Sequence, residues 1–240
     1  MNVVRYADRP DLRARRYDEL TKPTFPEYMN NNEPGDLYWD RLYTDFADFQ
    51  VALVDGDDLL AEAHAISLPW DGTVEDLPSG WDEGFVRGAT SERPHTALMA
   101  IAISIAPAQQ GRQLSGRMVG TFTDNARSAG LSSGVIAPVR PTWKERYPLV
   151  PIETYVSWRR EDGTHFDPWI RVHERVGGEI LQVAPRSMTI TAPVEDWERW
   201  TEMPFPGDGE YVFPGGLATL VVADGIGTHV EPNVWVLHRV

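Results

Sequence analysis

Apolar and polar positions recur along this chain with two different periods, and the changes of period mark the expected elements. Apolar residues three or four positions apart predict amphipathic helices, whereas alternation and short apolar runs predict strands. The pattern predicts strands over residues 2–7, 49–54, 59–68, 96–105, 133–139, 179–183 and 187–191, and two more in the tail 211–240 around Asp224-Gly225. It predicts helices over residues 8–20, 36–46, 116–129, 168–176 and 194–201.

Local turn and capping signals set several of these boundaries. Asp55-Gly56-Asp57 is a turn sequence between two apolar runs and predicts a β-hairpin. Asp167 followed by Pro168 predicts an N-cap residue with proline at the first helical position. Gly130 lies where a helix C-cap is expected.

Two long stretches show no clear period. Residues 69–94 are rich in Gly, Pro, Asp and Glu, with Trp70 and Trp81 as apolar anchors. A loop of this length is usually functional or disordered, and the tryptophans favour an ordered lid. Residues 140–166 form an aromatic connection interrupted by prolines. With no repeat and no linker, we expect a single domain over 1–240 that carries these two insertions and a C-terminal extension over 192–240.

Composition and charge exclude several classes of protein. The 240 residues are 42% hydrophobic, which gives ample material for a core, and the net charge of −14 disfavours nucleic acid and anionic membranes as partners. The absence of cysteine excludes disulfides and thiolate chemistry. The chain has no signal-like N-terminus and no apolar run of membrane-spanning length, so we expect a cytoplasmic protein. Lysine is rare beside arginine, which is typical of a GC-rich bacterial genome.

Common catalytic and metal-binding motifs are missing. The six histidines show neither HExxH nor HxH spacing, so no metal site is expected. The chain contains no phosphate-binding Walker loop and no GxSxG nucleophile elbow.

The strongest chemical signal is a loop that joins a buried strand to a helix. The apolar strand 96–105 ends before Pro107, and Gln110-Gly111-Arg112-Gln113-Leu114-Ser115 then opens the next helix. Successive backbone N–H groups at a helix N-terminus are unpaired and lie at the positive end of its dipole. The loop is therefore a candidate anion site.

This order of elements resembles the GNAT family of N-acetyltransferases over roughly residues 49–183. The loop pattern of that family is Arg/Gln, two residues, Gly, one residue, Gly/Ala; Gln110 matches its first position, whereas Gln113 and Ser115 replace its small residues. The resemblance implies an α/β fold with a mixed, twisted sheet and helices on both faces, and acetyl-CoA or another acyl-CoA as co-substrate. The cofactor-binding residues that it implies are Ile103, Ile105, Gln110, Gly111, Arg112, Gln113, Leu114 and Ser115.

The resemblance also places a candidate acid. Alignment on Gly177 puts His173 where the family commonly has a tyrosine that protonates the leaving thiolate, and an imidazolium could serve in that role. Phe166 stands where the family often has an asparagine. For the base, Glu62 and His64 point to the same face of their strand, and Glu92 or His95 are alternatives.

We therefore expect an acyltransferase that moves an acyl group, acetyl in the first instance, from acyl-CoA to an amine of a small molecule by direct attack. The acidic surface favours a cationic acceptor. Two alternatives stay open. The chain could use an acyl thioester for other chemistry, as a lyase, decarboxylase or acyl-carrier-dependent synthase, or it could be a non-catalytic ligand-binding module. Exposed edge strands would suit a homodimer.

Overall fold

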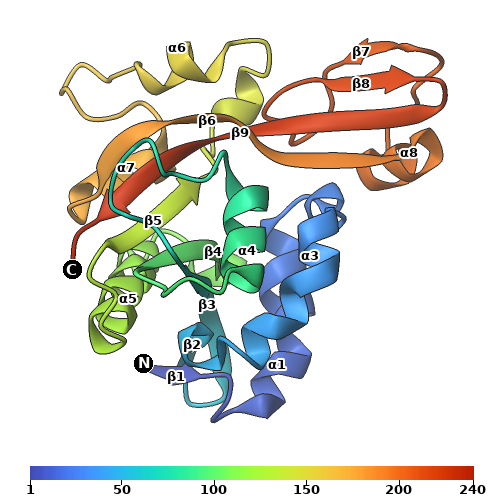
Figure 1. Ribbon diagram of the computed structural model, residues 1–240. Coiled ribbons are helices and arrows are strands. Elements are labelled where there is room, and N and C mark those ends of the chain that lie inside the picture. Colours follow the sequence, from blue (N-terminus) through green and yellow to red (C-terminus); the bar gives the residue numbers. More distant parts are fainter.

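The computed structural model describes residues 1–240 and places all nine strands in one mixed sheet (Figure 1). The strands run in the order β1-β2-β3-β4-β5-β9-β8-β7, and β6 pairs with the other edge of β9. β4 and β5 are parallel, and every other pair is antiparallel. The bounds are β1 (Asn2–Arg5), β2 (Val51–Asp55), β3 (Asp58–Leu68), β4 (Ala97–Ile105), β5 (Gly134–Val139), β6 (Glu179–Pro193), β7 (Gly209–Tyr211), β8 (Leu220–Ala223) and β9 (Ile226–His238).

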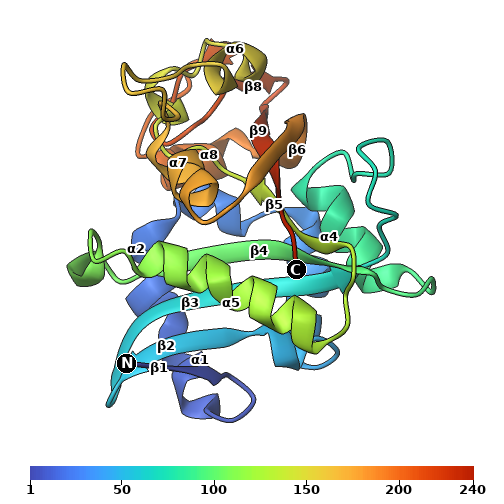
Figure 2. The same cartoon turned by 90° about the vertical axis from the view of Figure 1, so that its left-hand side faces the viewer.

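Helices cover both faces of the sheet, as Figure 2 shows for α5 on one side and the N-terminal helices on the other. Their bounds are α1 (Pro10–Arg16), α2 (Lys22–Thr24), α3 (Glu33–Tyr38), α4 (Trp81–Thr90), α5 (Leu114–Ser128), α6 (Ile152–Val156), α7 (Pro168–Arg175) and α8 (Val194–Thr201), with short π and 3₁₀ turns between several of them. The predicted mixed sheet with helices on both faces is confirmed. No helix is both long and apolar enough to cross a bilayer.

The local signals of the sequence correspond to real boundaries. The β2–β3 hairpin turns at residues 55–58, and the side chain of Asp167 accepts the backbone N–H groups of Trp169 and Ile170 as the N-cap of α7. The prediction of two separate strands over 179–191 is wrong, because β6 is continuous. The register of its pairing with β9 shifts between Ala184 and Met188, and this bulge contains Pro185. Proline has no N–H to donate to a neighbouring strand, so in the sequence it looks like the end of a strand, whereas a bulge accommodates it.

The expectation of an irregular loop over residues 69–94 is also wrong, because its second half is the helix α4. Gly80, Gly84 and Gly88 recur every fourth residue and lie on the packed side of this segment. A Cβ at Gly84 would meet the sulfur of Met99 at 2.3 Å, and one at Gly88 would meet the carbonyl oxygen of Ser67 at 2.8 Å. These glycines disfavour a helix by propensity, but here they let its backbone lie directly on the sheet.

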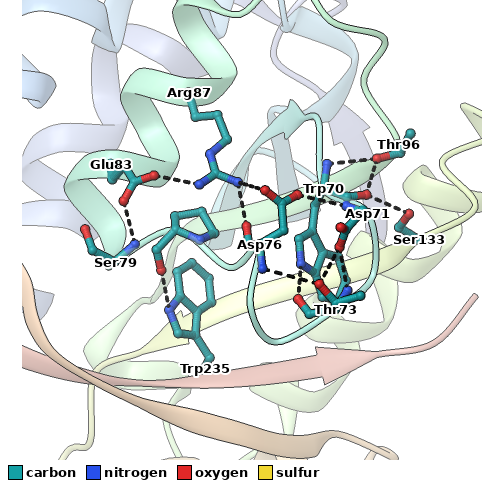
Figure 3. A network of polar contacts seen from close by, with 11 residues as sticks. Trp70, Asp71, Thr73, Asp76, Ser79, Glu83, Arg87, Thr96, Ser133 and Trp235 are labelled. Carbon is teal, nitrogen blue, oxygen red and sulfur yellow. Dashed lines mark hydrogen bonds and ion pairs between the residues drawn. The ribbon is translucent and has the colours of Figure 1, made fainter.

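The turn that leads into α4 is ordered by its own hydrogen bonds (Figure 3). The indole of Trp70 donates to the carbonyl of Thr73 at 2.7 Å, and the carbonyl of Trp70 accepts the hydroxyls of Thr96 and Ser133. The indole of Trp235 in β9 donates to the carbonyl of Pro78 at 3.0 Å. Within residues 69–94, Trp70 and the segment 77–89 thus form a packed wall that joins β3, β4 and β9, whereas residues 71–75 are an exposed turn, and the range does not form a separate lid.

The close approach at Gly80 gives a test of this packing. A Cβ there would lie 2.1 Å from the Cα of Ser187 in β6, so we expect Gly80→Ala to lower the free energy of unfolding by about 1–3 kcal/mol through overpacking. Gly120 in α5 has nothing within 4 Å of its position, so Gly120→Ala should raise stability by up to about 1 kcal/mol. Urea unfolding measures both, and equal effects of the two variants would contradict the packing described.

Candidate active site

β4 and β5 are paired only where both strands begin. Ala97, Leu98 and Met99 pair with residues 134–136, and the pairing ends there. β3 stays paired with β4 as far as Ile105, and β9 stays paired with β5 to its end. Each strand is therefore held on its outer edge while a gap opens between them.

Backbone groups of Ile103 and Ile105 face this gap. The N–H of Ala106 donates to the carbonyl of Leu60 at 2.9 Å, so Ile105 forms a non-hydrogen-bonded pair with β3. Along an antiparallel pair of strands, hydrogen-bonded and non-hydrogen-bonded residue pairs alternate, so Ile103, two residues from Ile105, also forms a non-hydrogen-bonded pair. The N–H and C=O groups of both isoleucines point away from β3 and lack a strand partner. An extended ligand can pair with such an edge as an added strand does.

A β-bulge lies at the inner end of the gap. His64 pairs with Ala102 and Ala65 pairs with Ala100, which leaves Ile101 without an opposite residue in β3. The carbonyl of Ile101 accepts the indole N–H of Trp81 at 3.0 Å. Bulges are over-represented next to active sites, where they redirect backbone groups.

The outer end of the gap is formed by the loop before α5. Gly111 has φ of 79° and Gln113 has φ of 60°, both in the left-handed region. Gln113 is the N-cap of α5, and its side chain does not bond the first N–H groups of the helix. These groups and the helix dipole together favour an anion at this point. Gln113 adopts the conformation that glycine adopts most easily, at the position where the resembled family has glycine.

A cavity of about 1160 Å³ joins the gap to the N-terminal helices and β9. Its lining includes residues of β4, of β5 and of the loop 109–115. Residues of the segment 16–40 and of β9 also line it. The charged residues on the wall are Arg16, Asp36, Asp40, Arg140, Glu145 and Glu231. A single cavity therefore offers an anion site, an unpaired strand edge and a charged chamber.

His173 reaches this cavity from α7, but not as an imidazolium. It is only 3% exposed, and its Nδ1 lies 2.9 Å from Nε2 of His238 in β9. Burial and the neighbouring His238 lower the pKa of His173 to about 3, so the ring is neutral near pH 7. Its Nε2 has no hydrogen-bond partner. The sequence-based premise of a charged imidazolium acid does not hold, because the histidine is desolvated.

Glu62 and His64 lie in a buried network and do not themselves line the cavity, although their partners Arg16 and Thr21 do. Glu62 accepts hydrogen bonds from Arg16, Tyr6, Thr21 and His64 at 2.7–3.0 Å. Burial alone would raise the pKa of Glu62, but His64 and Arg16 reverse the effect and hold it well below its usual range. Both side chains are fully buried. This placement does not support either residue as a base that meets an acceptor.

A second buried network, which the sequence did not indicate, also reaches the cavity, and here the carboxylate itself lines it. The carboxylate of Glu231 accepts hydrogen bonds from Nε of Arg140 at 2.7 Å and from the hydroxyl of Tyr28 at 3.1 Å. Nε2 of His229 lies 3.2 Å from the same carboxylate. Burial opposes ionisation, but Arg140 and His229 lower the pKa of Glu231 to about 2. The available signal was the run His229-x-Glu231-x-Asn233, polar residues on one face of an otherwise apolar strand.

The candidate site residues chosen from the sequence thus fall into two groups, those that line the cavity and those that do not. Seven of them line the one cavity: Ile103, Ile105, Gln110, Gly111, Leu114, Ser115 and His173. Arg112 and Gln113 belong to the same loop without lining the cavity, and Glu62 and His64 of β3 are buried in the network described above. His95 lies at the far end of β3, where its Nδ1 is 2.7 Å from the hydroxyl of Ser67, and Glu92 is exposed on the wall of residues 69–94.

Comparison with known proteins agrees with this geometry. No protein-family model matches the sequence. The arginine N-acetyltransferase avaD of Aspergillus versicolor is 28% identical over 273 residues, which covers 98% of this chain and 92% of that protein. The crystal structure of the loading GNATL domain of CurA from Lyngbya majuscula superposes with a TM-score of 0.63 at 17% identity and covers 99% of this chain and 96% of the other. The GNAT-like decarboxylase GphF in complex with isobutyryl-CoA gives a TM-score of 0.59 at 14% identity, with 99% and 98% covered.

The fold, with its split between β4 and β5, is GNAT-like. The chain is also similar over nearly its full length to an N-acetyltransferase, so the resemblance drawn from the sequence is confirmed.

The left-handed conformation of Gln113 predicts that its replacement by glycine raises the stability of the protein. Left-handed backbone costs an L-residue about 1–2 kcal/mol, so Gln113→Gly should raise the free energy of unfolding by up to about 1 kcal/mol after the extra entropy of the unfolded chain. Gln110 has φ of −60°, so Gln110→Gly should lower stability by about 0.5–1 kcal/mol. Urea unfolding measures both variants. A loss of stability in Gln113→Gly as large as in Gln110→Gly would contradict the prediction.

The His173–His238 pair predicts a loss of stability with acid. The folded pKa values of about 3 and about 4 lie below the ordinary value near 6.5, so the unfolded chain binds protons that the folded chain does not. Stability is fully present above pH 6.5 and falls as the pH drops toward these values, by up to about 1.4 kcal/mol per pH unit for each histidine. Urea unfolding at pH 7, 6 and 5 should show a shallower fall for His173→Gln than for the natural protein. Parallel curves would show that His173 does not carry this effect.

Proposed function

We propose that this protein transfers an acetyl group from acetyl-CoA to an amine of a small molecule. The observation that carries the proposal is the unpaired edge of β4, which leads from the N-terminus of α5 to the bulge at Ile101 within one cavity. This arrangement offers an anion site and an extended polar edge in the order in which the pyrophosphate and the amide-bearing arm of coenzyme A require them.

The pyrophosphate, the pantetheine arm and the thioester then each have a place along the cavity. In this proposal the pyrophosphate binds the N–H groups of Gly111, Leu114 and Ser115, and the lining of the cavity by these residues supports it. The amides of the pantetheine arm pair with the backbone of Ile103 and Ile105. The thioester then lies near Ile101, where the bulge separates β4 from the regular ladder.

The reaction in this site is direct attack. The nitrogen lone pair of the amine attacks the thioester carbonyl carbon, the C–N bond forms, and the C–S bond breaks with its electrons on sulfur. Glu231 is a poor base because its pKa is about 2 and both of its oxygens accept hydrogen bonds, so we propose that the amine loses its proton to water in the cavity.

His173 has a more limited role here than an imidazolium acid. If Nε2 of His238 donates to Nδ1 of His173, the proton of the neutral His173 ring lies on its partnerless Nε2. We propose that this N–H donates a hydrogen bond to the leaving sulfur, which then takes its proton from water.

For the acceptor we propose arginine or a similar cationic amine. The full-length relative is named an arginine N-acetyltransferase. Asp36, Asp40 and Glu145 are exposed on the cavity wall and, with a net charge of −14, attract a cation to the opening.

The direct test measures release of the CoA thiol from acetyl-CoA in the presence of arginine and a panel of other amines. We expect thiol release that depends on the amine, with one acetylated amine by mass for each thiol. Thiol release without any amine would instead support the lyase or decarboxylase alternative. If acetyl-CoA neither reacts nor raises the midpoint of thermal unfolding, the acyltransferase proposal fails and the ligand-binding alternative remains.

Ser115→Asp tests the anion site without disturbing the helix. A carboxylate in the first turn of α5 is favourable for the helix dipole, but it repels a pyrophosphate bound there. We expect the KM for acetyl-CoA to rise about tenfold or more, while urea unfolding shows undiminished stability. Ser115→Ala is the uncharged control and should change the KM less than about threefold. An unchanged KM in Ser115→Asp would place the pyrophosphate elsewhere.

A further inference from the structure

Trp81 is held rigidly at the inner end of the gap between β4 and β5. Its backbone N–H donates to the hydroxyl of Ser187 at 2.9 Å, and the next residue, Asp82, accepts the N–H of Thr189 at 2.8 Å. The absence of a side chain at Gly80 allows this close contact with β6. The first turn of α4 is therefore attached to β6 by two hydrogen bonds between backbone N–H groups and side chains, which leaves the tryptophan little freedom to move.

The indole itself lies against the bulge of β4. Its N–H donates to the carbonyl of Ile101 at 3.0 Å, its ring meets Phe85 edge to face at 5.0 Å, and the residue is only 7% exposed. Trp81 nevertheless lines the cavity. It is thus a buried wall residue of the cavity, fixed by both its backbone and its side chain.

The direction of the gap decides what this wall meets. A cofactor arm that starts at the loop 110–115 enters beside Ile105 and runs back along β4 toward Met99, where β5 closes the gap. From Ile105 to Ile101 a strand spans about 13 Å. A group carried at the end of the arm therefore arrives at the carbonyl that the indole of Trp81 already occupies.

Trp81 contributes a large, rigid side chain at this point. Ala100 and Ala102, which flank Ile101 in β4, and Ala137 in β5 also line the cavity and have small side chains. We propose that Trp81 limits the length of the acyl group, so that the site accepts acetyl-CoA and rejects acyl chains of four or more carbons. This inference rests on the proposed function, and it assigns a specificity role to a helix that the sequence pattern did not reveal.

The experiment compares kcat/KM for acetyl-, propionyl-, butyryl- and hexanoyl-CoA with one amine acceptor. The natural protein should prefer acetyl- over butyryl-CoA by about a hundredfold. Trp81→Leu, which shortens the side chain, should raise the butyryl-to-acetyl ratio at least about tenfold. Trp81→Phe keeps most of the bulk but loses the hydrogen bond to Ile101, so it should change the ratio less than about threefold.

Trp70→Phe is the matched control. Trp70 lies in the same insertion, is buried, and donates its indole N–H to a backbone carbonyl, but it does not line the cavity. This variant should leave the acyl preference unchanged. Circular dichroism and thermal unfolding verify that each variant is folded before its kinetics are compared.

The outcomes separate this inference from the proposed function. A folded Trp81→Leu protein with an unchanged ratio overturns the acyl-length role and leaves the acetyltransferase proposal intact. Equal kcat/KM for hexanoyl- and acetyl-CoA in the natural protein also overturns it, even if Trp81→Leu does not fold. If no amine is acetylated, thermal unfolding with each acyl-CoA still tests the inference, because acetyl-CoA should then raise the midpoint more than hexanoyl-CoA. Equal shifts would overturn it.

Discussion

The separation of β4 from β5 is the constraint on which the rest of the site depends. Backbone N–H and C=O groups that are buried without partners are unfavourable, so a sheet opens only where something else satisfies them. Here β3 holds one strand and β9 holds the other, and each remains in the sheet while the edges between them diverge after Met99. The groups left over, those of Ile103 and Ile105, face a cavity of about 1160 Å³ rather than a packed interior. Water or a ligand can reach them there, which is what makes the open edge tolerable and useful.

Two buried charge clusters hold the walls of this cavity. Each combines a glutamate with an arginine and with a histidine two positions away on the same strand: Glu62 with Arg16 and His64, and Glu231 with Arg140 and His229. Breaking such a pair leaves an unpaired buried charge at a cost of about 3–5 kcal/mol, so each cluster fixes its elements firmly. The first ties α1 to β3, and the second ties the segment around Tyr28 and the start of the 140–166 connection to β9. Their carboxylates are well suited to this structural task, and for the same reason they are weak bases.

The strongly acidic composition and an anionic cofactor are compatible in this fold. An N-terminus of a helix binds phosphate through backbone N–H groups and its dipole, so a site of this kind needs no surplus of lysine or arginine. If the proposed function is correct, the cofactor and the acceptor are attracted by different kinds of group. Backbone groups around Gly111 and Ser115 receive the anion, whereas side-chain carboxylates such as Asp36 and Asp40 attract a cationic acceptor. Gln113 adopts a left-handed backbone conformation, which glycine would adopt more easily.

The sequence by itself determined the elements whose signals are local. Apolar runs gave β3, β4 and β5, the turn at Asp55-Gly56-Asp57 gave the hairpin, and the Asp167-Pro168 pair gave the start of α7. The ordered pattern around the loop before α5 was sufficient to indicate a GNAT-like fold. Only the tertiary structure decided the rest. Three properties depend on neighbours far along the chain: the burial of Glu62, the neutral charge of the His173 ring, and the packing of the glycine-rich segment 80–88 as a helix. Burial and partner charges set the ionisation of a side chain, and close approach to the sheet reverses the propensity of glycine, so no local pattern carries that information.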